Sequence, residues 1–155
     1  MKLAFYIGRS VGAKFVHQGI LLVSDPHTHV ELIFDDDKSF SSEFGIGPRI
    51  ADIGYSHPER WTFVDLPWIT AEAQRRIRYR AELHNALRIA GYEKYDTRGA
   101  IGCAVTGQDD RWNWFCSEVV YDVLAPEIAI PTLNFKLHPQ RLFELIQVIK
   151  DLHTI

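Results

Sequence analysis

Cys116 is the residue whose surroundings in the sequence best suit it to covalent chemistry. It lies where an aromatic stretch, residues 112–115, gives way to an apolar pattern with helical spacing. Unpaired backbone N–H groups and the helix dipole favour negative charge at a helix N-terminus, and so favour a thiolate there. The same N–H groups can bind the oxyanion formed when sulfur attacks a carbonyl. We therefore predict Cys116 as a nucleophile. The alternative is a small apolar residue packed beneath Trp112 or Trp114.

His29 is the candidate partner of this thiol. It opens the stretch 29–34, in which Val30, Leu32 and Phe34 share one apolar face and His29 projects from the other. An imidazole beside a cysteine can take the thiol proton and later return it to the leaving group. The alternative for a histidine at a strand end is a solvated side chain with no part in chemistry.

The elements that must position these two residues divide into a strand-rich front and a helix-rich back. Strands are predicted over residues 3–7, 29–34, 39–43 and 61–66, with a hairpin turn at 35–38. The clearest helix begins after Thr70 and ends at Gly91. Further helices are predicted from Cys116 to Leu124 and after Pro139, and weaker helical patterns cover 10–23 and 96–103. The inner stripe of the 70–91 helix is predicted to be Ala73, Ile77, Ala81, His84 and Leu87.

Length and composition favour one ordinary globular domain spanning residues 1–155. The chain is 46% hydrophobic and 24% charged, with a formal net charge of -3. A dedicated nucleic-acid binder carries a clear basic excess, so we predict no nucleic-acid partner. No apolar stretch approaches the roughly 20 residues that span a bilayer, and no secretory signal is evident. Two cysteines are too few for a disulfide scaffold, which favours a reducing compartment.

Several short motifs resemble those of the circularly permuted papain-like amidases of the NlpC-type cysteine peptidase superfamily. They are Ser-Asp-Pro-His-Thr-His-Val-Glu-Leu-Ile-Phe at 24–34, Ser-Phe-Ser-Ser at 39–42, Tyr-Asp-Thr-Arg-Gly at 95–99 and Trp-Phe-Cys-Ser-Glu at 114–118. In the permuted members the histidine precedes the cysteine, as it does here. The resemblance implies an α+β fold in which a small antiparallel, barrel-like sheet packs against helices. It also implies thiol-dependent cleavage of an amide or ester.

A third polar residue usually orients the histidine in that superfamily, and two positions compete for this role. Ser41 lies on the following strand near the expected position, but serine stabilises an imidazolium poorly. Glu31 lies two residues beyond His29 and projects to the same face, about 6–7 Å along the strand. We predict Glu31, with pairing to Arg49 or simple exposure as the alternative. Glu118, in the first turn of the cysteine helix, is explained by the helix dipole.

The resulting hypothesis is a cysteine hydrolase that cleaves an amide bond, with a peptide or acyl substrate. The resemblance suggests peptidoglycan stem peptides as the first substrate to test. The compact size and the lack of an evident signal suggest a cytoplasmic or phage-associated location, with carriage on a phage particle or release by lysis as the route to the cell wall. A lipid or thioester acyl hydrolase or transferase would use the same dyad. A catalytically inactive binding or particle-assembly domain is the third reading.

No cofactor and no metal are predicted. His27 and His29 form a His-x-His pair with acidic residues nearby, but a metal site needs three or four converging ligands. The acidic run 35–37 already has a role in a turn. The arginines of the 70–91 helix suggest an anionic partner as an alternative, although Glu72 and Glu82 share that surface.

Overall fold

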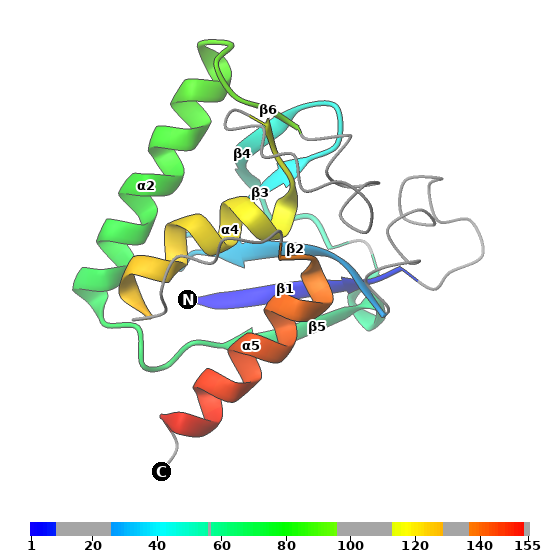
Figure 1. The fold of residues 1–155 in the computed structure, drawn as a ribbon, viewed down its shortest axis with the longest axis vertical. Helices are drawn as coiled ribbons and strands as arrows, with labels where there is room; N and C mark the ends of the chain where they lie inside the picture. The colour runs from blue at the N-terminus through cyan, green and yellow to red at the C-terminus, as the bar shows by residue number, and fades with distance from the viewer. Residues whose placement is uncertain (9–25, 56, 96–112, 129–136, 154–155) are drawn as a thin grey trace.

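A computed structural model describes residues 1–8, 26–55, 57–95, 113–128 and 137–153 (Figure 1). Five antiparallel strands form one sheet in the order β4-β3-β2-β1-β5. The strands are β1 (Lys2–Ile7), β2 (His27–Ile33), β3 (Lys38–Glu43), β4 (Gly47–Asp52) and β5 (Trp61–Asp65). Two short strands, β6 (Lys94–Tyr95) and β7 (Asn113–Trp114), pair in parallel as a second sheet.

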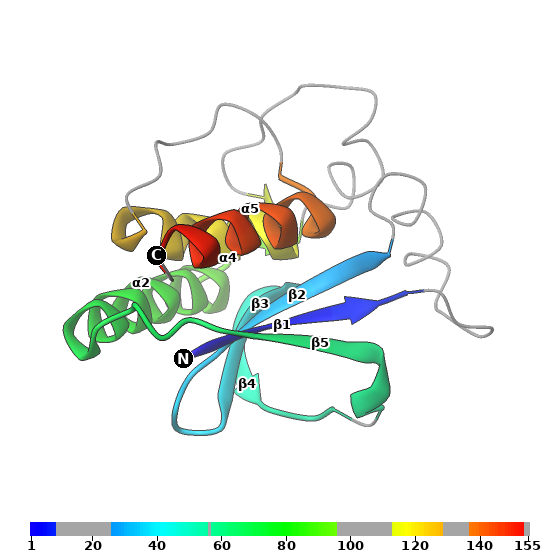
Figure 2. The ribbon, with the colours of Figure 1, turned by 90° about the horizontal axis from the view of Figure 1, so that it is seen from below.

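Three α-helices pack on one face of the five-stranded sheet, as Figure 2 shows. They are α2 (Ala71–Ile89), α4 (Cys116–Leu124) and α5 (Pro139–Leu152), and short 3₁₀ helices occupy Pro58–Arg60 (η1) and Ala125–Glu127 (η2). The chain is therefore an α+β protein, as the sequence predicts. Among the described residues, no helix has the length and apolar character needed to cross a membrane.

The alternation of β1 and β2 separates the core from the face that carries His29. Leu3 pairs with Leu32 and Phe5 with Val30, and all four side chains are fully buried beneath the helices. Tyr6 pairs with His29 on β2 and with Trp61 on β5, so these three residues share the opposite face. The alternation of these strands thus separates the buried core side chains from the side chains around His29.

The sheet is open, so the predicted barrel-like closure is wrong. Closure would require the two edge strands, β4 and β5, to pair with each other, whereas β5 pairs with β1 and β4 with β3. Strand β4 was not predicted because Gly47 and Pro48 resemble a turn. An edge strand tolerates proline because one side of its backbone needs no ladder partner.

Helix α2 confirms the strongest local prediction. The Thr70 hydroxyl accepts a hydrogen bond from the Ala73 backbone N–H at 3.2 Å, which makes Thr70 the N-cap. Gly91 has φ +83°, the left-handed conformation that ends a helix. Ala73, Ile77, Ala81 and His84 are buried as predicted, and Leu87 is half-buried. The helical predictions over 10–23 and 96–103, with Cys103, lie outside the described residues.

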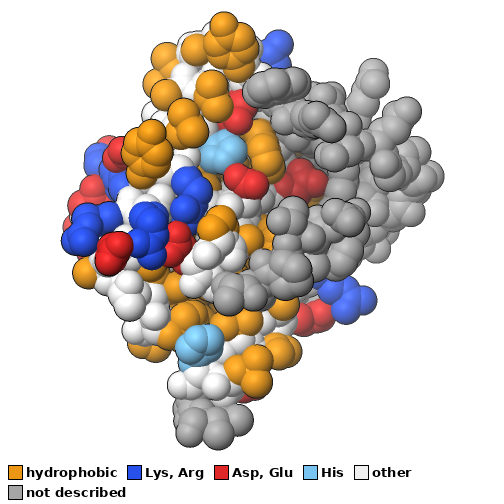
Figure 3. Space-filling view, turned by 60° about the vertical axis from the view of Figure 1, so that its left-hand side comes forward, with side chains coloured by type: hydrophobic (Ala, Val, Ile, Leu, Met, Phe, Trp, Pro, Cys, Tyr) orange, Lys and Arg blue, Asp and Glu red, His pale blue; other side chains and the backbone are white. Residues whose placement is uncertain are grey.

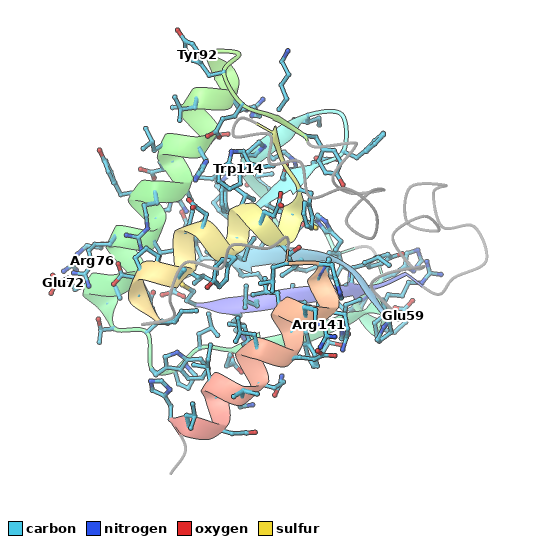
Figure 4. All side chains as sticks on the ribbon, in the orientation of Figure 1. Glu59, Glu72, Arg76, Tyr92, Trp114 and Arg141 are labelled. Atoms are coloured by element: carbon cyan, nitrogen blue, oxygen red, sulfur yellow. The ribbon has the colours of Figure 1, made fainter. Side chains whose placement is uncertain are left out.

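Basic and acidic side chains lie next to each other on the α2 face (Figure 3). Arg76 contacts Glu72 at 2.6 Å and Glu127 at 2.8 Å, and Arg80 contacts Glu127 at 2.8 Å (Figure 4). Hydrogen bonds from Arg76 and Arg80, with the charges of both, outweigh burial and lower the pKa of Glu127 to about 2. These arginines therefore hold α2 against η2, the 3₁₀ helix that follows α4.

Candidate active site

The first turn of α4 is fixed to its surroundings by side-chain hydrogen bonds. The helix begins at Cys116, and the backbone N–H of Phe115 donates to Glu118 Oε2 at 3.3 Å. Ser117 Oγ donates to the Leu137 carbonyl just before α5. The Glu118 carboxylate thus caps the start of the helix. Cys116 is a free cysteine and is only 1% exposed.

Serines of β3 connect β2 to the segment that leads into α4. The β2–β3 ladder is limited to Leu32 with Phe40 and Ile33 with Ser39. Beyond it, Ser41 Oγ donates to the Val30 carbonyl at 2.7 Å, and Ser42 Oγ donates to the Trp114 carbonyl at 2.6 Å. These side-chain bonds hold the start of α4 beside β2, the strand that carries His29.

The structure brings Cys116, His29 and Glu31 together. The His29 ring hydrogen-bonds the Cys116 side chain, and its Nε2 lies 3.3 Å from Glu31 Oε1. Since Nε2 faces Glu31, Nδ1 is the ring nitrogen left for the sulfur. The His29 and Glu31 side chains are 21% and 15% exposed. The imidazole is therefore partly open to solvent, whereas the Cys116 thiol is buried.

The charges around His29 favour its protonated form. Burial of the ring opposes protonation, but the negative charge of Cys116 and hydrogen bonds to Cys116 and Glu31 outweigh burial. Together they raise the pKa of the His29 imidazole to about 10. The ring therefore carries a positive charge at neutral pH and can stabilise an anionic sulfur beside it.

Glu31 remains ionised in this cluster although it is largely buried. Burial favours the neutral carboxyl, but a hydrogen bond to His29 and the His29 charge outweigh it, with help from Ser39 and Arg49. The pKa of Glu31 therefore lies below its usual value. Tyr55 Oη donates to Glu31 Oε2 at 3.3 Å. Burial and the Glu31 charge raise the pKa of the Tyr55 phenol, which keeps it a donor.

Aromatic rings form one wall beside His29. The Trp61 ring meets His29 edge-on with centroids 6.2 Å apart, and Tyr55 packs on Trp61 at 4.5 Å. Tyr6 packs on the same indole at 5.1 Å. Rings packed in this way restrict the orientation of the imidazole and limit its contact with water.

Two sequence candidates lie apart from this cluster. Ser41 hydrogen-bonds a backbone carbonyl instead of the His29 ring, because it replaces the missing ladder bond of β3. His27 faces α5, with Nδ1 2.7 Å from Gln140 Oε1 and its ring 4.4 Å from that of Phe143. The two histidines of the His-x-His pair therefore have different neighbours. Within the described ranges, no three His, Cys, Asp or Glu side chains could hold a metal ion.

The imidazole of His84 lies outside this cluster and was predicted only as part of the core. His84 Nδ1 lies 3.0 and 2.9 Å from the two Glu93 carboxylate oxygens, and Nε2 lies 3.1 Å from Asp122 Oδ2. Burial opposes protonation, but hydrogen bonds and charges from both carboxylates raise the pKa of His84 to about 9. A helical position predicts burial, but only tertiary structure reveals the two carboxylates.

Comparison with solved structures finds a fold that is similar to this chain. It is the crystal structure of metalloprotein yiiX from Escherichia coli O157:H7, described under DUF1105, with a TM-score of 0.54 and 17% sequence identity. The match covers 94% of this chain and 79% of that one. No family model matches the sequence, and no curated protein matches it.

This finding corrects the family assigned from the sequence motifs. The similar fold carries the DUF1105 description, which is distinct from that of the NlpC-type papain-like peptidases. The assignment was wrong because its motifs are short. They encode a strand that begins with histidine and a helix that begins with cysteine, and neither feature specifies how the remaining strands connect.

Proposed function

We propose that this protein is a cysteine-dependent acyl hydrolase that cleaves an amide or ester bond. The single observation that carries the proposal is the His29 ring, which hydrogen-bonds Cys116 at the N-terminus of α4 and Glu31 on its own strand. Nucleophile, base and orienting group in contact form the arrangement expected of nucleophilic catalysis. The raised pKa of His29 adds an electrostatic reason for an activated sulfur.

In the first half-reaction, the Cys116 sulfur attacks the carbonyl carbon of the substrate while His29 holds the proton from the thiol. Backbone N–H groups in the first turn of α4 bind the oxyanion of the tetrahedral intermediate. His29 then donates its proton to the departing amine or alcohol. The bond from the carbonyl carbon to this leaving group breaks, and a thioester on Cys116 remains.

In the second half-reaction, water hydrolyses the thioester. His29 removes a proton from the water as it attacks, and returns that proton to the Cys116 sulfur when the carbon–sulfur bond breaks. The products are the free acid and the original enzyme. Glu31 acts throughout by accepting a hydrogen bond from Nε2, which orients Nδ1 toward the sulfur and stabilises the imidazolium.

The proposal concerns the type of bond that is cleaved. Peptidoglycan depended on the family resemblance, and the phage-associated location was suggested to explain access to the cell wall, so neither is retained. The similar structure is titled a metalloprotein, but the described residues of this chain do not bring together a set of metal ligands. The steps above therefore use only the side chains of this chain.

Acylation by p-nitrophenyl acetate tests the proposal. We expect acid-quenched protein to carry one acetyl group on Cys116, located by peptide mass spectrometry, and to release more than one equivalent of p-nitrophenol. Cys116→Ala should remove both signals, and His29→Gln should slow acetylation, while Cys103→Ser should leave acetylation unchanged. No acetylation of Cys116, or equal acetylation in His29→Gln, would reject a hydrolase and favour a binding domain. Acetylation without turnover in water would favour an acyltransferase.

A further inference from the structure

His84 forms a buried connection between four parts of the chain. It lies on α2, and its ring nitrogens reach Glu93 just before β6 and Asp122 on α4. Its ring also meets that of Trp114, on β7, edge-on with centroids 5.0 Å apart. Residue exposure is 8% for His84 and 3% for Glu93, so both residues are buried.

The positions of these contacts bracket Cys116 in the sequence. Trp114 lies two residues before Cys116 and Asp122 lies six residues after it. One imidazole thus contacts the strand that enters α4 and the later part of the same helix (Figure 4 labels Trp114). The Trp114 carbonyl is held separately by Ser42 Oγ at 2.6 Å. The start of α4 is therefore constrained from both sides.

The chemistry of His84 suits it to positioning and excludes it as a base. Ionised carboxylates only accept hydrogen bonds, so both ring nitrogens must donate. A ring that donates from both nitrogens has no lone pair for a substrate proton. Gly91, with φ +83°, lets the chain reverse after α2 and bring Glu93 back onto this helix.

We propose that His84, held by Glu93 and Asp122, is a positioning residue that sets the location of Cys116 relative to His29. The inference rests on the proposed function, because it assigns His84 a part in the same cysteine–histidine site. His84 acts through Trp114 and Asp122, which fix the two ends of the segment that presents the sulfur.

Alkylation of Cys116 by iodoacetamide at pH 7 tests this inference in the full chain. Three network variants each change one member of the network formed by His84, Glu93 and Asp122. They are His84→Gln, Glu93→Gln and Asp122→Asn, and the Asp122 side chain is 50% exposed. His57→Gln, at a side chain 57% exposed, serves as the control for His84→Gln. We expect alkylation to slow about tenfold in the folded network variants, because small displacements of reacting groups cost up to about 100-fold in rate. His57→Gln should leave the rate unchanged.

A role limited to holding the fold would give the opposite result. Loosening the fold would expose the buried Cys116 sulfur, so its alkylation would become faster. NMR titration of His29 supplies a second readout: its pKa should fall in the network variants, since contact with Cys116 is one cause of its high value. Cooperative unfolding shows that a variant is folded. The inference would be overturned if such variants were alkylated faster than, or as fast as, the wild type and if their His29 pKa were unchanged.

The two proposals fail in different ways. If wild-type Cys116 reacts no faster than free cysteine and His29 titrates normally, both the hydrolase and the positioning role are rejected. If wild-type Cys116 is reactive and the network variants match it, the positioning role alone is rejected.

Discussion

Two imidazoles in this protein, those of His29 and His84, have similar electrostatics and different surroundings. His29 lies between a thiol and a carboxylate, and His84 lies between two carboxylates. Anionic neighbours raise the pKa of both rings, to about 10 and about 9. A raised histidine pKa alone therefore does not identify a reactive site in this fold.

The two histidines differ in the group that contacts the ring and in the exposure of the side chain to solvent. A carboxylate beside His84 accepts a hydrogen bond and does nothing further, whereas a sulfur beside His29 can leave the pair to attack a carbonyl. The His29 side chain is 21% exposed and that of His84 is 11% exposed. The His29 cluster is thus suited to chemistry and the His84 cluster to holding helices in place.

The largest expected effect is the loss of acylation in His29→Gln. Removing a positioned acid–base group costs about 10²- to 10⁴-fold in rate, so we expect p-nitrophenyl acetate to acylate Cys116 about 1,000-fold more slowly. His84→Gln should cost far less, about tenfold, since it only positions the sulfur. Stopped-flow release of p-nitrophenol measures both. Equal losses would erase the distinction between the two histidines.

The second prediction concerns stability against pH. The folded pKa of His84 lies above its ordinary value of 6.5, so its contribution is fully present below about pH 6.5 and is lost as pH rises through about 9. A shift of this size corresponds to about 3 kcal/mol. Urea unfolding at pH 7 and pH 10 should reveal that loss in a Cys116→Ala background. Removing Cys116 removes one cause of the raised His29 pKa, so His29 contributes less to the change in stability between the two pH values.

Adding His84→Gln to that background provides the control. The double variant should be less stable at pH 7 and should lose less stability between pH 7 and pH 10. An unchanged pH dependence would show that His84 is not an imidazolium in the folded protein.

The third prediction tests Glu31 as the orienting group. Glu31→Gln keeps the size of the side chain and removes the charge that holds Nε2 of His29. A hydrogen bond between charged groups contributes about 2 kcal/mol, so acylation of Cys116 should slow about 30-fold. Ser41→Ala should leave this rate nearly unchanged, since Ser41 binds the Val30 carbonyl. The reverse order of effects would assign the orienting role to Ser41.

The smallest effect is expected for Tyr55→Phe. This change removes the hydroxyl that donates to Glu31 and keeps the ring that packs on Trp61. Loss of one such hydrogen bond costs about 1 kcal/mol, or about fivefold in the acylation rate. A loss as large as that of Glu31→Gln would instead give the phenol a direct part in the reaction.

Local sequence patterns predicted much of the fold. Alternation of apolar residues identified β2 and its buried face. Thr70 marked the start of α2, and Gly91 marked its end. These features depend on neighbours close in sequence. The open sheet and β4 were not predicted, because strand order depends on long-range pairing and Gly47-Pro48 resembles a turn.

The candidate site was partly predictable for the same reason. Strand period placed Glu31 on the His29 face, and helix-start chemistry singled out Cys116. The Tyr55 donor and the carboxylates around His84 could not be predicted, since loops and distant elements bring them in. Motifs of a few residues also led to the wrong family, because they describe a local site and leave the connections between elements open.

NMR titration of the His29 imidazole, in the wild type and in Cys116→Ala, tests the central claim most directly. The claim is that the Cys116 sulfur and the His29 ring form one electrostatic pair. We expect His29 to titrate near pH 10 in the wild type and at a clearly lower pH in Cys116→Ala, because the Cys116 charge is one cause of the raised pKa. The His84 titration should stay the same in both proteins. A His29 titration near pH 6.5, or one that Cys116→Ala leaves unchanged, would contradict the pair and the hydrolase proposal with it.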